Sequence, residues 1–479
     1  MVLRLSLFCL LLTGTLSAQR SVQQLVADFA GTQVLGKALV AVDIRSVVDG
    51  RQLASHNAGV ACIPASTQKL ITTAAAMDLL GADYRFQTRL IASGPVTEGT
   101  LRGNLYIVGG GDPTLGSERM DGADELEAVV EQWAAAVRKR GITRITGAVV
   151  GDGSRYGTDG TGRGWPWADL GNYYGAGAYG LNVNENSYEI TFSQRPEVGS
   201  TPPVLRTEPV VPGLEFTNEL RSGPRGSGDQ AYIYGAPFNH HHFIRGSIPA
   251  GTGSFRIRGS LPDPAMLAAQ LLNQRLETDG VSIIGPPATH LTLGGYTVGE
   301  MLDEQYSPHL SEIVDRTNLQ SVNLYAESLL REINKVNGQP VEELSSTDVL
   351  VDWLGSQGLD TEGVNLRDGS GLDPRNFFSP AFMTAFLVSQ AGAERWIESI
   401  PLAGRTGSLR NVLRGTVAEG RVRGKSGTVN AVRTYAGYVD RPDGRRLAYS
   451  IAVNNHDLRS SVVNRLIYDL MRDLCTASL

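Results

Sequence analysis

The chain has 479 residues, of which 41% are hydrophobic and 19% charged, a composition typical of a globular protein with enough apolar residues for a sizeable core. This length predicts about three domains. The net charge is −6 and no long run of either sign occurs, which excludes nucleic acid as the main partner, because phosphate binding needs clustered lysine and arginine.

The first residues have the three parts of a signal peptide. Arg4 gives the positive start, residues 5–12 form a short apolar run, and the small residues after it predict cleavage near Ser17 or Ala18. The apolar run is too short to span a bilayer. We therefore expect residues 1–18 to direct export and the mature protein to be periplasmic or otherwise extracytoplasmic.

The two ends of the mature chain predict parts of one sheet. The expected strands are 38–44, 52–56, 433–439 and 447–453. The expected helices are a mostly apolar one over 65–80, which Pro64 opens, and an amphipathic one over 460–474. We expect these segments to form an antiparallel sheet flanked by helices, an α+β arrangement.

The middle of the chain has a different texture. Residues 103–116 and 151–180 are rich in glycine, residues 188–258 are strand-like with many prolines and glycines, and residues 263–280 predict a helix. We interpret this middle as one or two inserted domains.

Cysteine and histidine give no sign of a metal or other cofactor. Cys9 leaves with the signal segment, and Cys62 and Cys475 are either two buried thiols or one disulfide. No Cys/His spacing is typical of zinc. The run 240–242 is three consecutive histidines, which cannot all face one ion on a regular element, so we expect a solvated loop there.

The first chemical motif is Ser66-Thr67-Gln68-Lys69 on the predicted helix. Residues three apart share a helix face, so the Ser66 hydroxyl and the Lys69 amine point into the same space. A serine becomes a good nucleophile when a base takes its proton, and a buried lysine with a lowered pKa can be that base. Alone the motif is weak, and an exposed helix position is then the better explanation of it.

The second motif is Ser321-Val322-Asn323 at a predicted helix entry. A second hydroxyl there can relay a proton, and an amide can hold the substrate backbone or the lysine. The alternative is ordinary helix capping by Asn318 or Ser321.

The third motif is Lys425-Ser426-Gly427-Thr428, just before the strand predicted over 433–439. Lys425 supplies positive charge, the Ser426 and Thr428 hydroxyls can bind a carboxylate, and Gly427 lets a substrate lie close to the backbone. The alternative is a basic turn between strands, which this motif taken alone favours. A phosphate-binding loop is rejected, because that loop opens a helix and this segment leads into a strand.

The three motifs in this order resemble the set used by penicillin-recognising serine enzymes. Over nearly the whole mature chain the sequence resembles the penicillin-binding protein 4 type of D-alanyl-D-alanine carboxypeptidase, the low-molecular-mass class C enzymes. The further segments that carry this resemblance are 110–115, 151–154, 164–170, 173–175, 181–184, 368–372, 402–404 and 407–409.

The resemblance implies a β-lactamase/transpeptidase-like fold with two nested, β-rich insertions, which agrees with the long separation of Ser66 and Ser321. The expected division of the chain is 19–88 with 300–479 for the catalytic domain, 89–155 with 256–299 for the first insertion, and 156–255 for the second.

The resemblance also implies the activity: hydrolysis of peptidoglycan stem peptides and cross-links through an acyl-enzyme on Ser66, with β-lactam antibiotics as covalent inhibitors. Its catalytic residues would be Ser66, Lys69, Ser321, Asn323 and Lys425, and its substrate-binding residues Ser426, Gly427, Thr428 and Asp152. The family usually has threonine where this chain has Ser426. No cofactor is implied, and membrane contact would be peripheral at most.

Three alternatives remain beside this reading. A β-lactamase would need a deacylation base, and no Glu-x-x-Leu-Asn stands at class A spacing. An esterase of the α/β-hydrolase type would need a Gly-x-Ser-x-Gly elbow around its serine, and this sequence contains none. An inactive penicillin-binding-like scaffold of the cell wall is disfavoured, because all three motifs retain reactive side chains.

Overall fold

The computed structural model describes residues 20–479, so the predicted signal segment lies outside the described residues. The two ends of the described chain build one five-stranded antiparallel sheet in the order β19-β20-β21-β1-β2. Its strands are β1 (Leu39–Ser46), β2 (Gln52–His56), β19 (Val422–Val429), β20 (Val432–Asp440) and β21 (Arg446–Asn454). The four strands predicted from the sequence are thereby confirmed.

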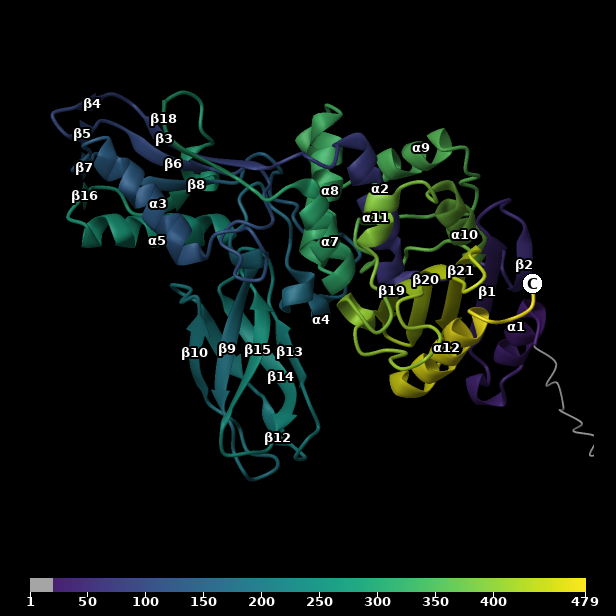
Figure 1. Cartoon of the computed structure of the whole chain (residues 1–479). Coiled ribbons are helices and arrows are strands. Elements are labelled where there is room, and N and C mark those ends of the chain that lie inside the picture. Colours follow the sequence, from purple (N-terminus) through teal and green to yellow (C-terminus); the bar gives the residue numbers. More distant parts are fainter. Residues whose placement is uncertain (1–19) are drawn as a thin grey trace, which may run out of the picture.

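Helices cover both faces of this sheet, and successive buried side chains of its strands point in turn into the two cores. In β20, Tyr435 and Val439 belong to the core under α1 (Val22–Ala30) and α12 (Ser460–Leu474), whereas Ala436 and Tyr438 face the opposite core. That opposite core contains α2 (Lys69–Leu79), α7 (Leu310–Gln320), α8 (Asn323–Val336), α9 (Asp348–Ser356), α10 (Pro380–Ser389) and α11 (Glu394–Glu398). The result is three layers, with the sheet in the middle (Figure 1).

The middle of the chain forms separate sheets on one side of these layers (Figure 1). One has the order β17-β8-β6-β3-β18 and a smaller one the order β16-β7-β5-β4. The strands are β3 (Gln87–Ser93), β4 (Val96–Thr97), β5 (Thr100–Leu101), β6 (Asn104–Val108), β7 (Arg144–Ile145), β8 (Val149–Asp152), β16 (Ser282–Ile283), β17 (Ala288–Thr289) and β18 (Glu300–Tyr306). The helices are α3 (Leu126–Lys139), α5 (Pro264–Thr278) and α6 (His290–Leu293).

A second β-rich unit extends away from that sheet (Figure 1). Its strands are β9 (Ser187–Ser193), β10 (Val204–Glu208), β11 (Glu215–Asn218), β12 (Arg221–Gly223), β13 (Gln230–Tyr234), β14 (His241–Pro249) and β15 (Ser254–Ser260). The short helix α4 (Trp167–Leu170) precedes it. The loop predicted for residues 240–242 is wrong in part: His241 and His242 begin β14, and His242 is buried against the Tyr188 hydroxyl, which lies 3.2 Å from its Nδ1.

The domain boundaries stay a prediction. β18 pairs with β3, so this strand, which the predicted division assigns to the catalytic part, belongs to a sheet of the insertion. Among residues 20–479 both cysteines, Cys62 and Cys475, are buried and unpaired thiols, so the disulfide alternative is wrong. Of the helices in the described part of the chain, none is long and apolar enough to cross a membrane.

Candidate active site

Ser66 lies in a short 3₁₀ turn, η2 (Ala65–Gln68), which leads directly into α2. The sequence predicted a single helix from residue 65, but Ala65 has a φ of 46°, a left-handed conformation that an alanine rarely adopts. This turn leaves Ser66 partly exposed while its neighbours Thr67 and Gln68 are buried. The Ser66 side chain is therefore accessible to solvent, at the N-terminal end of a helix that is otherwise largely buried.

Lys69 is fully buried beneath Ser66. Its Nζ lies 3.0 Å from Ser66 Oγ and also donates to Asn323 Oδ1 at 2.5 Å and to the Ser370 carbonyl at 2.7 Å. Burial lowers the pKa of Lys69 to about 7, against the opposing charges of Asp368 and Glu327, which raise it. A large fraction of this amine is therefore neutral near pH 7, as a general base must be.

A second lysine lies on the other side of the site. Ser321 ends α7 with a φ of 60°, and Lys425 on the edge strand β19 donates from Nζ to Ser321 Oγ at 2.8 Å and to the Ser426 carbonyl at 2.9 Å. Burial, and then the charge of Lys69, lower the pKa of Lys425 well below its usual value. The second and third motifs thus meet in one Ser–Lys contact.

Gly427 shows how closely β19 lies against the nucleophile. A Cβ at this position would come within 2.5 Å of the Pro64 carbonyl oxygen and 3.1 Å of the Ser66 backbone nitrogen, and would also strike the Thr434 hydroxyl. Only glycine fits this approach. The strand therefore forms one wall of the site, with Ser426 partly exposed and Thr428 exposed along it.

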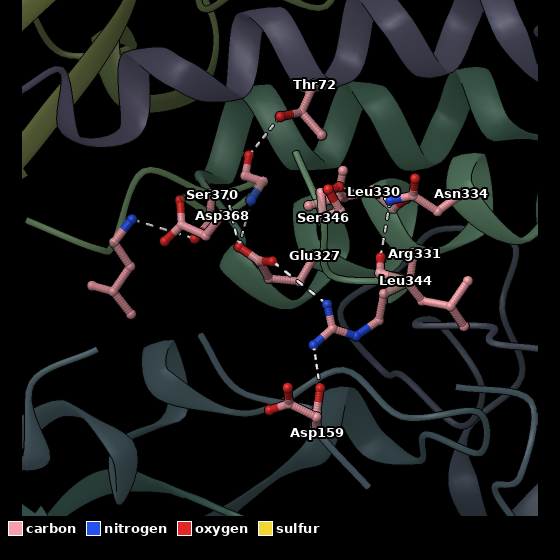
Figure 2. Close-up of polar contacts among 12 residues, drawn as sticks. Thr72, Asp159, Glu327, Leu330, Arg331, Asn334, Leu344, Ser346, Asp368 and Ser370 are labelled. Atoms are coloured by element: carbon pink, nitrogen blue, oxygen red, sulfur yellow. Dashed lines mark hydrogen bonds and ion pairs between the residues drawn. The ribbon is translucent and has the colours of Figure 1, made fainter. Parts of the chain in front are cut away.

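A buried carboxylate supports the loop that holds Lys69. Glu327 on α8 accepts from the backbone N–H groups of Gly369 at 3.0 Å and Ser370 at 2.8 Å, and the Ser370 carbonyl in turn accepts from Lys69. Figure 2 shows Glu327 between this loop and Arg331, whose Nη1 lies 3.9 Å from Glu327 Oε2. Burial and the nearby Asp368 charge raise the pKa of Glu327 to about 7.

Asp368 connects the same loop to the insertion. Its carboxylate accepts from the Gln68 side chain at 3.2 Å, from the Trp165 indole at 2.9 Å, from the Asn376 amide at 2.9 Å and from the backbone N–H groups of Gly371 and Asp373. Because Gln68 follows the nucleophile by two residues, the loop, the nucleophile turn and the inserted segment are fixed together.

Asn323 makes a second contact with the insertion. Its Nδ2 donates to the Tyr174 carbonyl at 2.7 Å while its Oδ1 accepts from Lys69. Of the predicted site residues, the structure thus brings Ser66, Lys69 and Asn323 into one bonded group and Ser321 and Lys425 into a second, with β19 beside both.

Asp152 is held elsewhere. It is buried at the end of β8, where its carboxylate accepts from the backbone N–H groups of Ser154 at 2.9 Å and Tyr296 at 2.6 Å. Within residues 20–479, none of its hydrogen bonds reaches the Ser66 group. Its role in substrate recognition stays a prediction.

Sequence reasoning missed Glu327, Asp368, Ser370 and Tyr174 as parts of the site. Ser370 and Tyr174 act through backbone carbonyls, which any residue could supply, so no side chain signals them. The one available signal was the family resemblance, whose segments 173–175 and 368–372 contain Tyr174, Asp368 and Ser370.

No group of three or more His, Cys, Asp or Glu side chains that could hold a metal ion occurs in the described residues. The polar atoms at the site are instead two amines, two hydroxyls and an amide joined by hydrogen bonds. This arrangement suits nucleophilic attack by serine with proton transfer through lysine.

The sheet between helices, with a serine–lysine pair at the start of a buried helix, defines the class of penicillin-recognising serine enzymes. The sequence matches the D-Ala-D-Ala carboxypeptidase 3 (S13) family over residues 21–473, and the chain belongs to this family. It is a serine-type D-Ala-D-Ala carboxypeptidase of the penicillin-binding protein 4 type, as predicted.

Individual relatives agree with this assignment. The D-alanyl-D-alanine carboxypeptidase of Actinomadura sp. (strain R39) is 31% identical over 444 residues, which is 88% of this chain and 78% of the relative. The crystal structure of penicillin-binding protein 4 from Haemophilus influenzae is similar with a TM-score of 0.79 at 23% identity, covering 94% of this chain and 98% of that one. A structure of that protein complexed with a β-lactam gives 0.74 at 21% identity, with the same coverage.

A more distant solved structure is the peptidoglycan endopeptidase Bd3459 of Bdellovibrio bacteriovorus, with a TM-score of 0.50 at 15% identity over 92% of this chain and 93% of that one. These likenesses confirm the predicted β-lactamase/transpeptidase-like fold.

Proposed function

We propose that this enzyme hydrolyses peptidoglycan stem peptides and their cross-links through an acyl-enzyme on Ser66, and that β-lactams inhibit it by acylating the same serine. The observation that carries the proposal is the 3.0 Å contact between Ser66 Oγ and the Nζ of Lys69, whose pKa burial lowers to about 7. A neutral amine at this distance can take the hydroxyl proton as the oxygen attacks.

In acylation, Ser66 Oγ forms a bond to the carbonyl carbon of the penultimate D-alanine, and Lys69 Nζ takes the hydroxyl proton. The carbon–nitrogen bond then breaks, and the departing D-alanine needs a proton on its nitrogen. Ser321 can give this proton and recover one from Lys425, whose Nζ lies 2.8 Å from its hydroxyl. The leaving group departs as a neutral amine, and the ester on Ser66 remains.

The negative charge on the carbonyl oxygen needs donors in the transition state. The backbone N–H groups of Ser66 and Thr428 are the proposed pair, since β19 lies directly against the nucleophile turn. Removing one donor from such a hole typically costs about 10²–10³ in rate. Water then attacks the ester carbonyl and gives a proton, through Ser321, to Lys425, which acylation left as a free amine. The bond from the carbonyl carbon to Ser66 Oγ breaks, Ser66 takes back the proton that Lys69 holds, and the shortened peptide leaves.

A β-lactam follows the first half of this path. Attack by Ser66 opens the four-membered ring, but the amine stays attached to the acyl group and cannot diffuse away. Support comes from the family membership and from the complex of the H. influenzae relative with a β-lactam.

Substrate binding is assigned by chemistry and position. The Ser426 and Thr428 hydroxyls on the edge strand would bind the terminal carboxylate, Gly427 would let the peptide lie along β19, and Asn323 would hold the peptide backbone. Asp152 would contact the stem-peptide side chain. Ser426 keeps the hydroxyl of the family's usual threonine and lacks only its methyl group.

The substrate lies outside the cytoplasm, so the proposal includes export through the signal segment at residues 1–18. Cleavage of cross-links as well as terminal D-alanine is supported by the fold shared with the Bdellovibrio peptidoglycan endopeptidase. The partners are thus peptidoglycan peptides and, as covalent inhibitors, β-lactams.

The test is digestion of purified muropeptides followed by chromatography and mass spectrometry. Monomers that end in D-Ala-D-Ala should lose one alanine, and cross-linked dimers should yield monomers, with wild-type enzyme and not with Ser66→Ala. Products of equal amount from the variant would contradict the proposal. Unchanged dimers with trimmed monomers would restrict it to carboxypeptidase activity.

A further inference from the structure

The sheet formed by β11, β12, β13 and β14 in the second β-rich unit has one buried face and one face in solvent. Phe216, Ile233 and Ile244 point into the core. The alternation of side chains and the strand register place a second set together on the solvent side: Tyr232, Tyr234, His241, Phe243 and Arg245. The solvent face of an antiparallel sheet is normally polar, so a row of aromatic side chains there indicates a binding surface.

The rings on this face lie against one another and against an arginine. The His241 and Phe243 rings are stacked, with centroids 5.3 Å apart and 21° between their planes. The Arg245 guanidinium lies 5.2 Å from the centre of the Tyr234 ring and 5.4 Å from that of Phe243. Tyr232 is nevertheless 44% exposed and Phe243 36%, so flat aromatic surface remains open to solvent.

This surface continues toward the candidate active site through α4, which lies beside β13 (Figure 1). Trp167 in α4 is 54% exposed, and its ring centroid lies 6.0 Å from that of Tyr234. Asp169 of the same helix accepts from the Tyr174 hydroxyl at 3.1 Å, and the Tyr174 carbonyl accepts from Asn323. The aromatic platform is the name used below for Trp167, Tyr232, Tyr234, His241, Phe243 and Arg245.

The side chains of the platform suit a neutral ligand that is not a lipid. Arg245 donates to Glu219 at 2.6 Å, so its guanidinium offers a flat face and not an unpaired charge. Among the outward positions of the four described strands, none holds leucine, isoleucine, valine or methionine. A face that inserts into lipid normally carries aliphatic side chains together with free cations.

Sugar rings have the matching chemistry. The C–H groups on the face of a sugar ring pack on an aromatic ring, and the hydroxyl and acetamido groups at its edge bond to polar side chains. Thr217 and Glu215 on β11 and Gln230 on β13 are polar side chains of the same face. The stem peptide fits the platform poorly, because alanine and charged side chains offer little surface to stack on aromatic rings.

The position of the platform selects the glycan strand of peptidoglycan as the sugar. Each stem peptide is bonded to that strand, and about four residues before the scissile bond span roughly 13 Å when extended. A sugar bonded to a stem that reacts at Ser66 therefore lies near the catalytic part. The platform begins in the segment that contacts Asn323, itself bonded to Lys69 beside the nucleophile.

We propose that the aromatic platform binds the glycan strand of peptidoglycan, with sugar rings stacked on Trp167, Tyr232 and Phe243, while a stem peptide of the same strand lies at Ser66. The inference rests on the proposed function and adds a second binding site to it. Binding of the strand raises the effective concentration of its stems at the nucleophile. The enzyme therefore prefers stems that are attached to glycan over free peptides.

The experiment compares a free pentapeptide that ends in D-Ala-D-Ala with soluble, uncross-linked glycan strands that carry the same pentapeptide. Wild-type kcat/KM, expressed per stem, should be at least about tenfold higher on the strands. In Tyr232→Thr/Phe243→Thr it should fall by about 5- to 30-fold on the strands, because two stacking rings are lost. It should change by less than about twofold on the free peptide, which does not reach the platform. Threonine suits exposed strand positions, so the sheet is preserved.

Tyr306→Thr is the matched control. Tyr306 is a 49% exposed tyrosine on β18, the edge strand of the other inserted sheet, with the Arg85 guanidinium 5.4 Å from its ring centre. This variant should keep the wild-type ratio of strand to peptide turnover. Titration calorimetry with glycan strands stripped of peptide measures the contact without catalysis: wild type and Ser66→Ala should bind alike, and the double variant more weakly.

A wild-type enzyme without preference for the strands would overturn the inference, as would equal losses of the double variant on both substrates or an equal loss in Tyr306→Thr. Binding to phospholipid vesicles that the double variant loses, without binding to glycan, would also overturn it and identify a membrane surface. Melting temperatures reveal a folding defect in the double variant, and Trp167→Ala then takes its place. If the proposed function fails, wild type cleaves neither substrate, and calorimetry still decides whether the strand binds.

Discussion

Replacing Glu327 with glutamine tests how the protein sets the basicity of Lys69. The carboxylate of Glu327 bonds the Ser370 N–H at 2.8 Å, and the Ser370 carbonyl bonds Lys69 at 2.7 Å (Figure 2 shows Glu327 beside Ser370). Glutamine has nearly the same shape, and its amide oxygen can still accept both backbone bonds. The substitution therefore removes a charge while it preserves the position of the loop.

The size of the expected pKa change follows from the distance between the Glu327 carboxylate and the Lys69 ammonium. Since both groups bond the backbone of the same residue, Ser370, they lie on the order of 7 Å apart. At an effective dielectric constant of about 20, two unit charges at this distance interact by about 2 kcal/mol, which is more than one pKa unit. Burial and the Asp368 charge raise the pKa of Glu327 to about 7, so it is only partly ionised near neutrality. We expect the pKa of Lys69 to fall by about 0.5 to 1 unit.

The direction of the pH effect is fixed by the role of Lys69. Acylation requires its neutral form, so the rate rises with pH through a pKa that burial brings to about 7. Loss of the Glu327 charge removes an interaction that favours the ammonium, and the acidic limb should move to lower pH. The assay is the second-order rate of acylation by a fluorescent penicillin, measured by stopped flow between pH 5 and 8.5.

Glu332→Gln is the matched control for this experiment. Glu332 lies on the same helix, is equally buried and bonds Tyr156 at 2.6 Å and Arg155 at 3.1 Å, but it does not contact the 368–371 loop. Its acidic limb should coincide with that of wild type. An unmoved acidic limb in Glu327→Gln, or an equal shift in Glu332→Gln, would show that the Glu327 charge does not set the pKa of Lys69.

Three further results are expected. Gly427→Ala should fold but reduce acylation by at least about tenfold in the same assay, because the added methyl group would lie 2.5 Å from the Pro64 carbonyl oxygen and force β19 away from Ser66; acylation at the wild-type rate would contradict this close approach. Ser426→Thr should change kcat/KM on the D-Ala-D-Ala peptide by less than about threefold, since the hydroxyl is retained, and a loss above tenfold would show that the site needs the smaller side chain. Asp368→Ala should lower the free energy of unfolding by about 3 kcal/mol or more in urea titrations, because buried donors from the nucleophile turn, the loop and Trp165 lose their acceptor; wild-type stability would mean that water replaces the carboxylate.

Much of the catalytic part could be predicted from local sequence. The turn residues Asp49 and Gly50 precede the strand at 52–56, and the strand at 447–453 is apolar except for Ser450. Pro442 with Gly444 defines the hairpin between β20 and β21. The helix 460–474 matches α12 in both bounds, because its apolar face repeats with the helical period.

The 3₁₀ turn at Ser66 could not be predicted in this way. Its form depends on Ala65 at positive φ, which tertiary contacts impose: Thr434 bonds the Pro64 carbonyl from a strand far along the chain. His242 was misjudged for a related reason, since its burial depends on a partner, Tyr188, that is distant in sequence.

For the site, the three motifs identified the side chains that do chemistry but not the groups that hold them. The sequence predicted that Lys69 is buried and that Lys425 supplies positive charge. The spacing of the motifs did not tell which lysine would contact Ser321 and which would contact Asn323. Asp368 lies in a segment of the family resemblance, but its partners could not be read from the sequence, and Glu327 carries no signal at all, because a carboxylate on an amphipathic helix is usually exposed.

The central claim is that Ser66, activated by Lys69, forms an acyl-enzyme. Intact mass spectrometry after brief exposure to benzylpenicillin tests it most directly, with Ser66→Ala as the control. We expect a stable adduct of one penicillin per wild-type chain and none on Ser66→Ala. An unmodified wild-type chain would contradict the claim, and hydrolysis of the antibiotic in that case would indicate a β-lactamase.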